Sequence, residues 1–127
     1  MTDINSNATE MINHLTSVAH ETAIEHGFYA DLQHLTSSLR VEGMFEEIYL
    51  VDRSFTLEQI AKIVSECGEA VSAIQHDMAD DIVAEELADV VIRTLDLAGH
   101  MGVDFGSILI DKMEANKQRP YKHGKVC

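Results

Sequence analysis

Two short acidic motifs in the chain each place a pair of carboxylates three residues apart. The first is S-E-C-G-E, with Glu66 and Glu69, and the second is E-E-L-A-D, with Glu86 and Asp89. On a helix, residues three apart project from nearly the same side. Either pair alone is ordinarily just a solvated helix face. Two such helices packed face to face, however, would gather four carboxylates, whose mutual repulsion favours a divalent cation among them.

The other residue patterns narrow the kind of ion that such a site would take. The chain has no C-x-x-C, H-E-x-x-H or Glu-x-x-His motif, which argues against zinc, redox cysteine and ferritin-like di-iron sites. The seven histidines are interpreted as surface residues. The remaining ligands are all oxygen atoms, and such a set suits Mg²⁺ or Mn²⁺.

A basic cluster lies near the C-terminus. Five of the nine Lys and Arg residues fall within 112–125. Lys112 and Asn116 are one helical turn apart, and Arg119 and Lys122 follow. The helix dipole alone explains cations at a helix end. Beside a site of four carboxylates and a metal ion, the same cluster is typical of a polyphosphate clamp.

Apolar spacing and capping signals predict that helices position both clusters. The expected helices run from Asn7 to Gly27, over Phe28–Leu39, over Leu57–Asp77 after a Thr56–Gln59 capping box, from a cap at Asp80 or Asp81 to Gly99, and from a cap at Asp104 to Pro120. The segment Arg40–Phe55 is the least readable part, and M-F-E-E-I-Y-L-V-D within it fits either one or two helical turns or a short extended piece.

Apolar residues cover more than one side of the two acidic helices. The stripe Ile60, Val64, Val71 and Ile74 is widened by Ala70 and Ala73, and Val90 and Ile92 do the same for the second helix. On the last helix, Phe105, Ile108, Leu109 and Met113 form the expected buried stripe. A chain of 127 residues has little else to cover these faces, which predicts a homo-oligomer.

Length and composition predict one all-α domain spanning residues 1–127. The net charge of −13 argues against nucleic acid and anionic membranes as partners. It leaves a nucleotide ligand open, because a bound metal ion can reverse the local charge. The absence of a signal sequence, a long apolar run and a cysteine framework predicts a cytoplasmic protein.

The two acidic motifs also resemble a known signature. S-E-C-G-E-A-V and E-E-L-A-D-V-V-I-R look like the E-x-x-E…E-x-x-D signature of the MazG-like all-α nucleoside triphosphate pyrophosphohydrolases. The closing K-M-E-A-N-K-Q-R-P-Y-K-H-G-K is similar to the C-terminal motif of one branch, and H-E-T-A-I-E-H-G-F resembles the N-terminal signature of that branch. Together the resemblance covers residues 20–28 and 57–125.

The resemblance implies a four-helix-bundle-type fold assembled from a homodimer or a dimer of dimers. It implies Mg²⁺, or Mn²⁺, held by four catalytic carboxylates, and cleavage of a (deoxy)nucleoside triphosphate to the monophosphate and pyrophosphate in nucleotide-pool house-cleaning. Carried over, the metal ligands are Glu66, Glu69, Glu86 and Asp89, and the phosphate-binding residues are Lys112, Asn116, Arg119 and Lys122. Ser65 replaces a Glu found in many members, which leaves the number of metal ions open.

Two other readings remain. One is a catalytically silent helical dimer that binds a nucleotide or a protein. The other is a related phosphoribosyl-ATP or dUTP pyrophosphohydrolase. The chain has no Trp, and nothing in the sequence identifies the preferred base or sugar.

Overall fold

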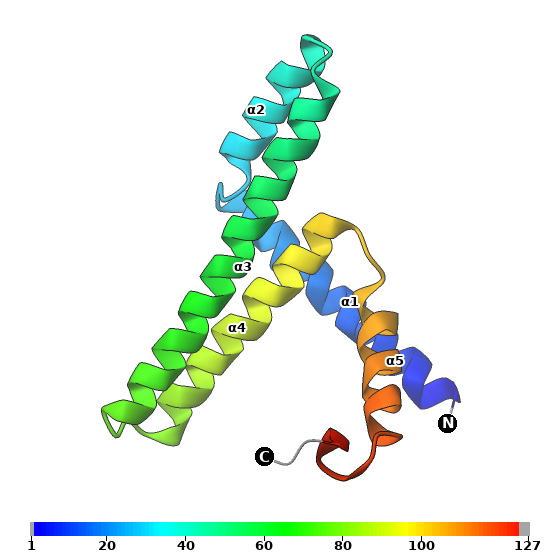
Figure 1. Cartoon of the computed structure of the whole chain (residues 1–127), viewed down its shortest axis with the longest axis vertical. Coiled ribbons are helices and arrows are strands. Elements are labelled where there is room, and N and C mark those ends of the chain that lie inside the picture. Colours follow the sequence, from blue (N-terminus) through cyan, green and yellow to red (C-terminus); the bar gives the residue numbers. More distant parts are fainter. Residues whose placement is uncertain (1, 125–127) are drawn as a thin grey trace.

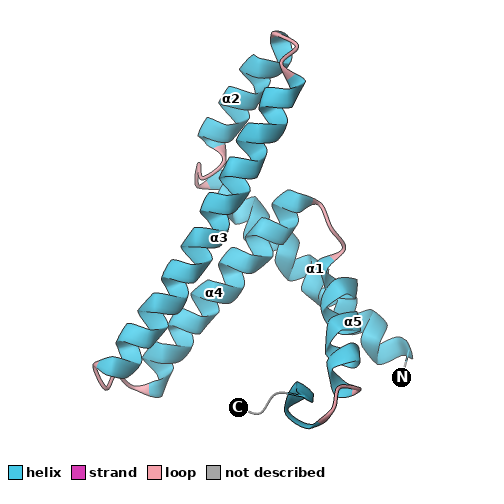
Figure 2. Ribbon diagram, viewed as in Figure 1, coloured by secondary structure: helices cyan, strands magenta, loops and turns pink. Residues whose placement is uncertain are grey.

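The computed structural model describes residues 2–124, and within them it contains helices and no strand (Figure 2). The elements are α1 (Thr2–Glu25), α2 (Ala30–Val41), α3 (Phe45–Gln75), α4 (Asp80–Met101), α5 (Phe105–Lys117) and the 3-10 helix η1 (Tyr121–Gly124). The prediction of an all-α fold is confirmed. No helix in the described part is both long and apolar enough to cross a membrane. Lys125 of the basic cluster and Cys127 lie outside the described residues.

The helices are arranged as pairs that do not close into a bundle within one chain (Figure 1). α2 packs against the first half of the long helix α3, and α4 returns along its second half. α1 crosses α4, and α5 packs against α1. From the sequence, the four-helix bundle was expected to form only when copies of the chain assemble. The bundle therefore remains a prediction.

Local sequence signals end and begin several helices where they were expected. Gly27 has φ +83°, and the N–H of Phe28 donates to the carbonyl of Ala23 at 3.1 Å, a bond that closes the end of α1. Asp104 caps α5 by accepting from the N–H of Ser107 at 3.1 Å. Asn13 of α1 donates to the same carboxylate at 2.8 Å, and these bonds lower the pKa of Asp104. The α5 cap therefore also fastens α5 to α1.

Three predicted helix starts were wrong. α1 begins at Thr2 rather than at Asn7. α3 begins at Phe45 and continues through the supposed capping box, where the hydroxyl of Thr56 donates back to the carbonyl of Asp52 at 2.9 Å inside the helix. α4 begins at Asp80, with Ala79 at the N-cap and no side-chain cap bond. The unreadable segment 40–55 thus contains the α2–α3 turn and the first part of α3.

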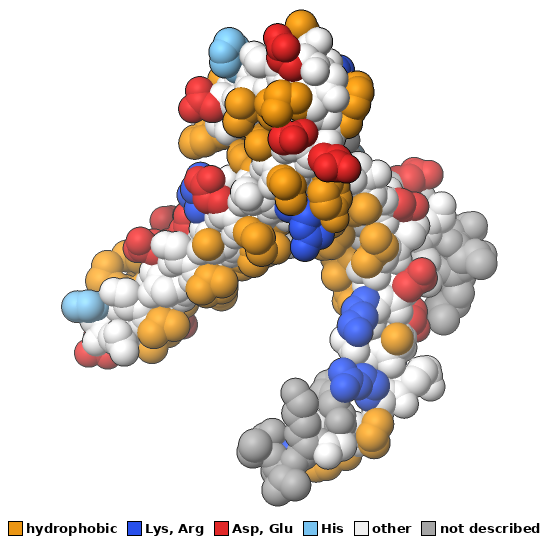
Figure 3. Space-filling model, turned by 45° about the horizontal axis from the view of Figure 1, so that its top comes forward, with side chains coloured by type: hydrophobic (Ala, Val, Ile, Leu, Met, Phe, Trp, Pro, Cys, Tyr) orange, Lys and Arg blue, Asp and Glu red, His pale blue; other side chains and the backbone are white. Residues whose placement is uncertain are grey.

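The buried apolar side chains of the described residues are mostly small. Among the described residues, the buried apolar ones are Tyr29, Ala70, Ala73, Leu97 and Ala98. Large stripe residues remain exposed, such as Val64 at 64%, Leu87 at 53% and Met113 at 52%, and apolar side chains are scattered over the visible surface (Figure 3). Burial of the α5 stripe was therefore a wrong prediction for the single chain, since Ile108 is also exposed.

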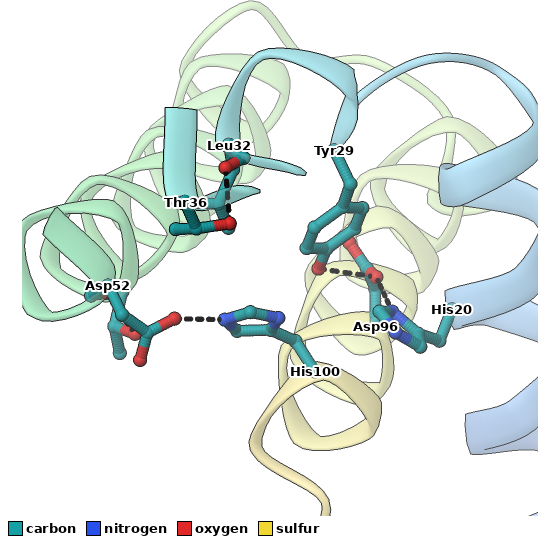
Figure 4. Close-up of polar contacts among 8 residues, drawn as sticks. His20, Tyr29, Leu32, Thr36, Asp52, Asp96 and His100 are labelled. Carbon is teal, nitrogen blue, oxygen red and sulfur yellow. Dashed lines mark hydrogen bonds and ion pairs between the residues drawn. The ribbon is translucent and has the colours of Figure 1, made fainter. Parts of the chain in front are cut away.

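A polar network joins α1, α3 and α4 where they meet (Figure 4). The hydroxyl of the buried Tyr29 donates to Asp96 Oδ1 at 2.8 Å, and His20 Nδ1 lies 3.0 Å from the same oxygen. His100 Nε2 lies 2.7 Å from Asp52 Oδ1, and its ring lies 5.2 Å from that of Tyr29. Burial and the Asp96 carboxylate raise the pKa of Tyr29. The prediction of surface histidines is therefore wrong for His20 and His100.

Replacing Tyr29 with Phe tests how much this network stabilises the fold. Tyr29→Phe keeps the ring but removes a bond to a largely buried carboxylate, so the free energy of unfolding should fall by about 1–3 kcal/mol. Urea denaturation followed by circular dichroism measures the difference. The matched control is Tyr49→Phe, whose exposed hydroxyl accepts from Arg53 and whose loss should change stability by less than about 0.5 kcal/mol. Equal losses in both variants would contradict a stabilising role for the network.

Candidate functional site

The antiparallel pairing of α3 and α4 brings the two acidic motifs together. Glu66 and Asp89 are equally far from the centre of the α3–α4 turn, and Glu69 and Glu86 are equally far from it as well. Carboxylate oxygens of Glu66, Glu86 and Asp89 all lie within 4.8 Å of one another. Glu69 is exposed and lies outside this group. The structure thus gathers three of the four predicted carboxylates.

Mutual repulsion within this carboxylate group acts on the pKa of Glu86. Desolvation raises the pKa of Glu86 above its ordinary value, and the charges of Glu69, Asp89 and Glu66 raise it further. The effect of Glu69 means that it lies near enough to act on Glu86 electrostatically. A set of oxygen ligands that repel one another is the donor set that a hard divalent cation stabilises.

Arg93 is a member of the site that the sequence reasoning assigned no role. Its Nε donates to Glu66 Oε1 at 2.7 Å. It lies four residues after Asp89 on α4, which places both on one face of that helix. This spacing was the one sequence feature that could have pointed to Arg93. An arginine on a helix is usually solvent-exposed, however, so the spacing alone does not indicate a functional residue.

A cavity of about 560 Å³ opens beside the carboxylate group, between α1, α3 and α4. One side is apolar and includes Leu15, Val18 and Ala19 of α1 and Ile92 of α4. The polar lining residues include Gln59, Lys62, Glu66, Asp89, Arg93 and Asp96. A volume of this size and a wall of mixed character are typical of small-ligand sites.

The predicted phosphate-binding residues lie elsewhere in the chain. Lys112 and Arg119 are exposed, as is Lys122, which has φ +54°. Asn116 is half-buried, and its Oδ1 is buried without a hydrogen-bond partner among the described residues. None of these four residues lines the cavity. α5 descends on the other side of the molecule from the α3–α4 turn, and basic side chains are visible along it (Figures 1 and 3).

Comparison with known proteins identifies the region that carries these features. A model of the MazG nucleotide pyrophosphohydrolase domain matches residues 55–120. No curated protein and no solved structure matches the chain. The match begins inside α3, covers α4 and α5, and includes the carboxylate group, Arg93, Lys112 and Asn116. The match extends over more than half of the chain and contains the acidic motifs that the antiparallel pair of α3 and α4 brings together. The protein therefore belongs to the MazG nucleotide pyrophosphohydrolase family.

Proposed function

We propose that the protein hydrolyses a (deoxy)nucleoside triphosphate to the monophosphate and pyrophosphate, with Mg²⁺ or Mn²⁺ as cofactor. The observation that carries this proposal is the convergence of Glu66, Glu86 and Asp89, two of which, Glu66 and Asp89, line a cavity large enough for a nucleotide. Family membership supports the class of reaction. A house-cleaning role in the cytoplasm is part of the same proposal.

The oxygen donors of the site fit a hard divalent cation. Glu66, Glu86 and Asp89 would hold it, with Glu69 as the fourth ligand. When bound, such an ion neutralises phosphate charge and makes a coordinated water more acidic. One carboxylate of the group would take the proton of the attacking water. The water oxygen attacks the α-phosphorus, the bond to the α–β bridging oxygen breaks, and pyrophosphate leaves.

A second copy of the chain would complete the site. α3 carries a stripe of exposed apolar side chains at heptad spacing, which is the pattern of a helix-packing face without a partner. These residues are Leu57, Ile60, Val64, Val71 and Ile74. The acidic group and the basic cluster of α5 are complementary in charge but apart in one chain. We therefore propose a homo-oligomer in which Lys112, Asn116, Arg119 and Lys122 of one copy bind the phosphates held at the carboxylates of another.

Metal binding should stabilise the protein through the carboxylate group. Addition of Mg²⁺ should raise the melting temperature of the wild type, because the ion binds the native state and relieves repulsion there. The rise should be much smaller in Asp89→Asn and Glu69→Gln. The control is Glu47→Gln, which removes one exposed carboxylate in the first turn of α3 and should keep the full rise. An equal rise in all variants, measured by differential scanning fluorimetry, would mean that the ions bind elsewhere.

Kinetics should separate the carboxylates from the basic cluster. Glu86→Gln should lower kcat at least about 100-fold, a loss that more substrate does not restore. Loss of a residue that only supports a metal ligand already costs about 10–100-fold in metal affinity or activity. Lys112→Ala should raise KM about tenfold through loss of a charged phosphate contact. A panel of nucleotides with Mg²⁺ and Mn²⁺ is assayed separately for pyrophosphate and orthophosphate. Orthophosphate release would indicate a phosphatase, and absence of turnover throughout would favour a silent binding protein.

Mixed oligomers should test whether one site uses two chains. Asp89→Asn and the double variant Lys112→Ala/Arg119→Ala are each expected to be nearly inactive at substrate concentrations well below the KM of the wild type. Co-expressed in equal amounts, they should regain about a quarter of wild-type activity, because half of randomly paired dimers are mixed and each mixed dimer has one intact site. Activity no higher than the sum of the separate variants would contradict a shared site. A stable monomer in light scattering at micromolar concentration would contradict the oligomer itself.

A further inference from the structure

Arg93 lies at the junction of the carboxylate group and the cavity. It lines the cavity together with Glu66 and Asp89, and its Nε is bonded to Glu66 at 2.7 Å. The Glu66 side chain is 17% exposed, whereas that of Arg93 is 41% exposed. The carboxylate is therefore largely enclosed, and the guanidinium group still reaches open space.

The bond to Glu66 uses only part of what the guanidinium group can donate. An arginine carries several N–H donors in a planar fork that matches the oxygens of a phosphate group. Among the described residues, Arg93 makes one side-chain hydrogen bond and one ion pair, and both join its Nε to Glu66 Oε1. Both terminal amino groups thus keep their donors for a ligand in the cavity.

The balance of charge also favours a phosphate ligand near Arg93. A site built only to hold a metal ion gains nothing from a nearby cation, which repels the ion. A triphosphate adds negative charge to a group of carboxylates that already repel one another. Lys62 is the other Lys or Arg that lines the cavity among the described residues, and it is paired with Glu58 at 3.1 Å. Arg93 is therefore the cation best placed to compensate for that added charge.

We infer that Arg93 binds the α-phosphate of the substrate, in the same chain whose carboxylates hold the metal ion. This inference rests on the proposed function. In the free protein Arg93 holds Glu66 in place. With substrate bound, its terminal amino groups donate to the oxygens of the phosphate that is attacked. The basic cluster of α5 would then bind the β- and γ-phosphates. Arg93 would therefore contact the nucleoside monophosphate product, and the basic cluster would contact pyrophosphate.

The two reaction products distinguish this role from a purely structural one. The nucleoside monophosphate retains the α-phosphate, and pyrophosphate does not. In calorimetric titrations with Mg²⁺, Arg93→Gln should bind nucleoside 5′-monophosphates about 10- to 100-fold more weakly than the wild type and should bind inorganic pyrophosphate equally well. Arg93→Lys, which keeps the charge but loses the fork, should be intermediate. The control Arg53→Gln removes an exposed arginine bonded to Tyr49 and should match the wild type.

Each other outcome decides against the inference. If Arg93→Gln binds monophosphates as tightly as the wild type, Arg93 does not contact the α-phosphate. If it loses both products together with Mn²⁺, measured by electron paramagnetic resonance without nucleotide, Arg93 only positions Glu66. These results leave the proposed function intact. A wild type that binds neither product and hydrolyses no triphosphate would overturn the proposed function and this inference together.

Discussion

The close pairing of α3 with α4 is the constraint on which the rest of this molecule depends. Ala70 and Ala73 are buried, and small side chains at these positions let two helices approach closely. In such a hairpin, residues equally far from the turn lie opposite each other. That geometry sets Glu66 against Asp89 and makes carboxylates converge within 4.8 Å, against their own repulsion. A structure that holds this arrangement stores electrostatic free energy, which a cation can release.

Other contacts hold the remaining helices around this hairpin. The bond of Tyr29 to Asp96 holds the start of α2 against α4, and the contact of His20 with the same carboxylate holds α1 where it crosses α4. Asp96 lines the cavity as well, so the network and the site share a side chain. Much of the apolar wall comes from α1, which lies outside the matched residues 55–120. The carboxylates that line the cavity thus belong to the α3–α4 pair, and much of its apolar wall belongs to a different part of the chain.

The site was predictable where its geometry follows from spacing along one helix, and it was not where partners come from different helices. Pairs three residues apart share a helix face whatever the tertiary structure, so both acidic motifs could be recognised. Capping at Asp104 and the glycine end at Gly27 are equally local. The bond of Arg93 to Glu66 and the burial of His20 depend on how helices cross, and no local pattern encodes that. The predicted cap at Thr56 was wrong because α3 already begins at Phe45, and inside the helix the Thr56 hydroxyl bonds to the backbone of the preceding turn.

By itself, the sequence determined the all-α class, the two acidic motifs, the basic cluster and the resemblance to the MazG family, since each is a matter of residue type and short-range spacing. Only the tertiary structure decided that three of the four carboxylates meet, that Arg93 joins them, and that the basic cluster of α5 lies apart from them in one chain. The physical reason is the same in each case. Helical periodicity specifies which side a residue faces, whereas the partner on that side is specified by packing between helices that are distant in the sequence.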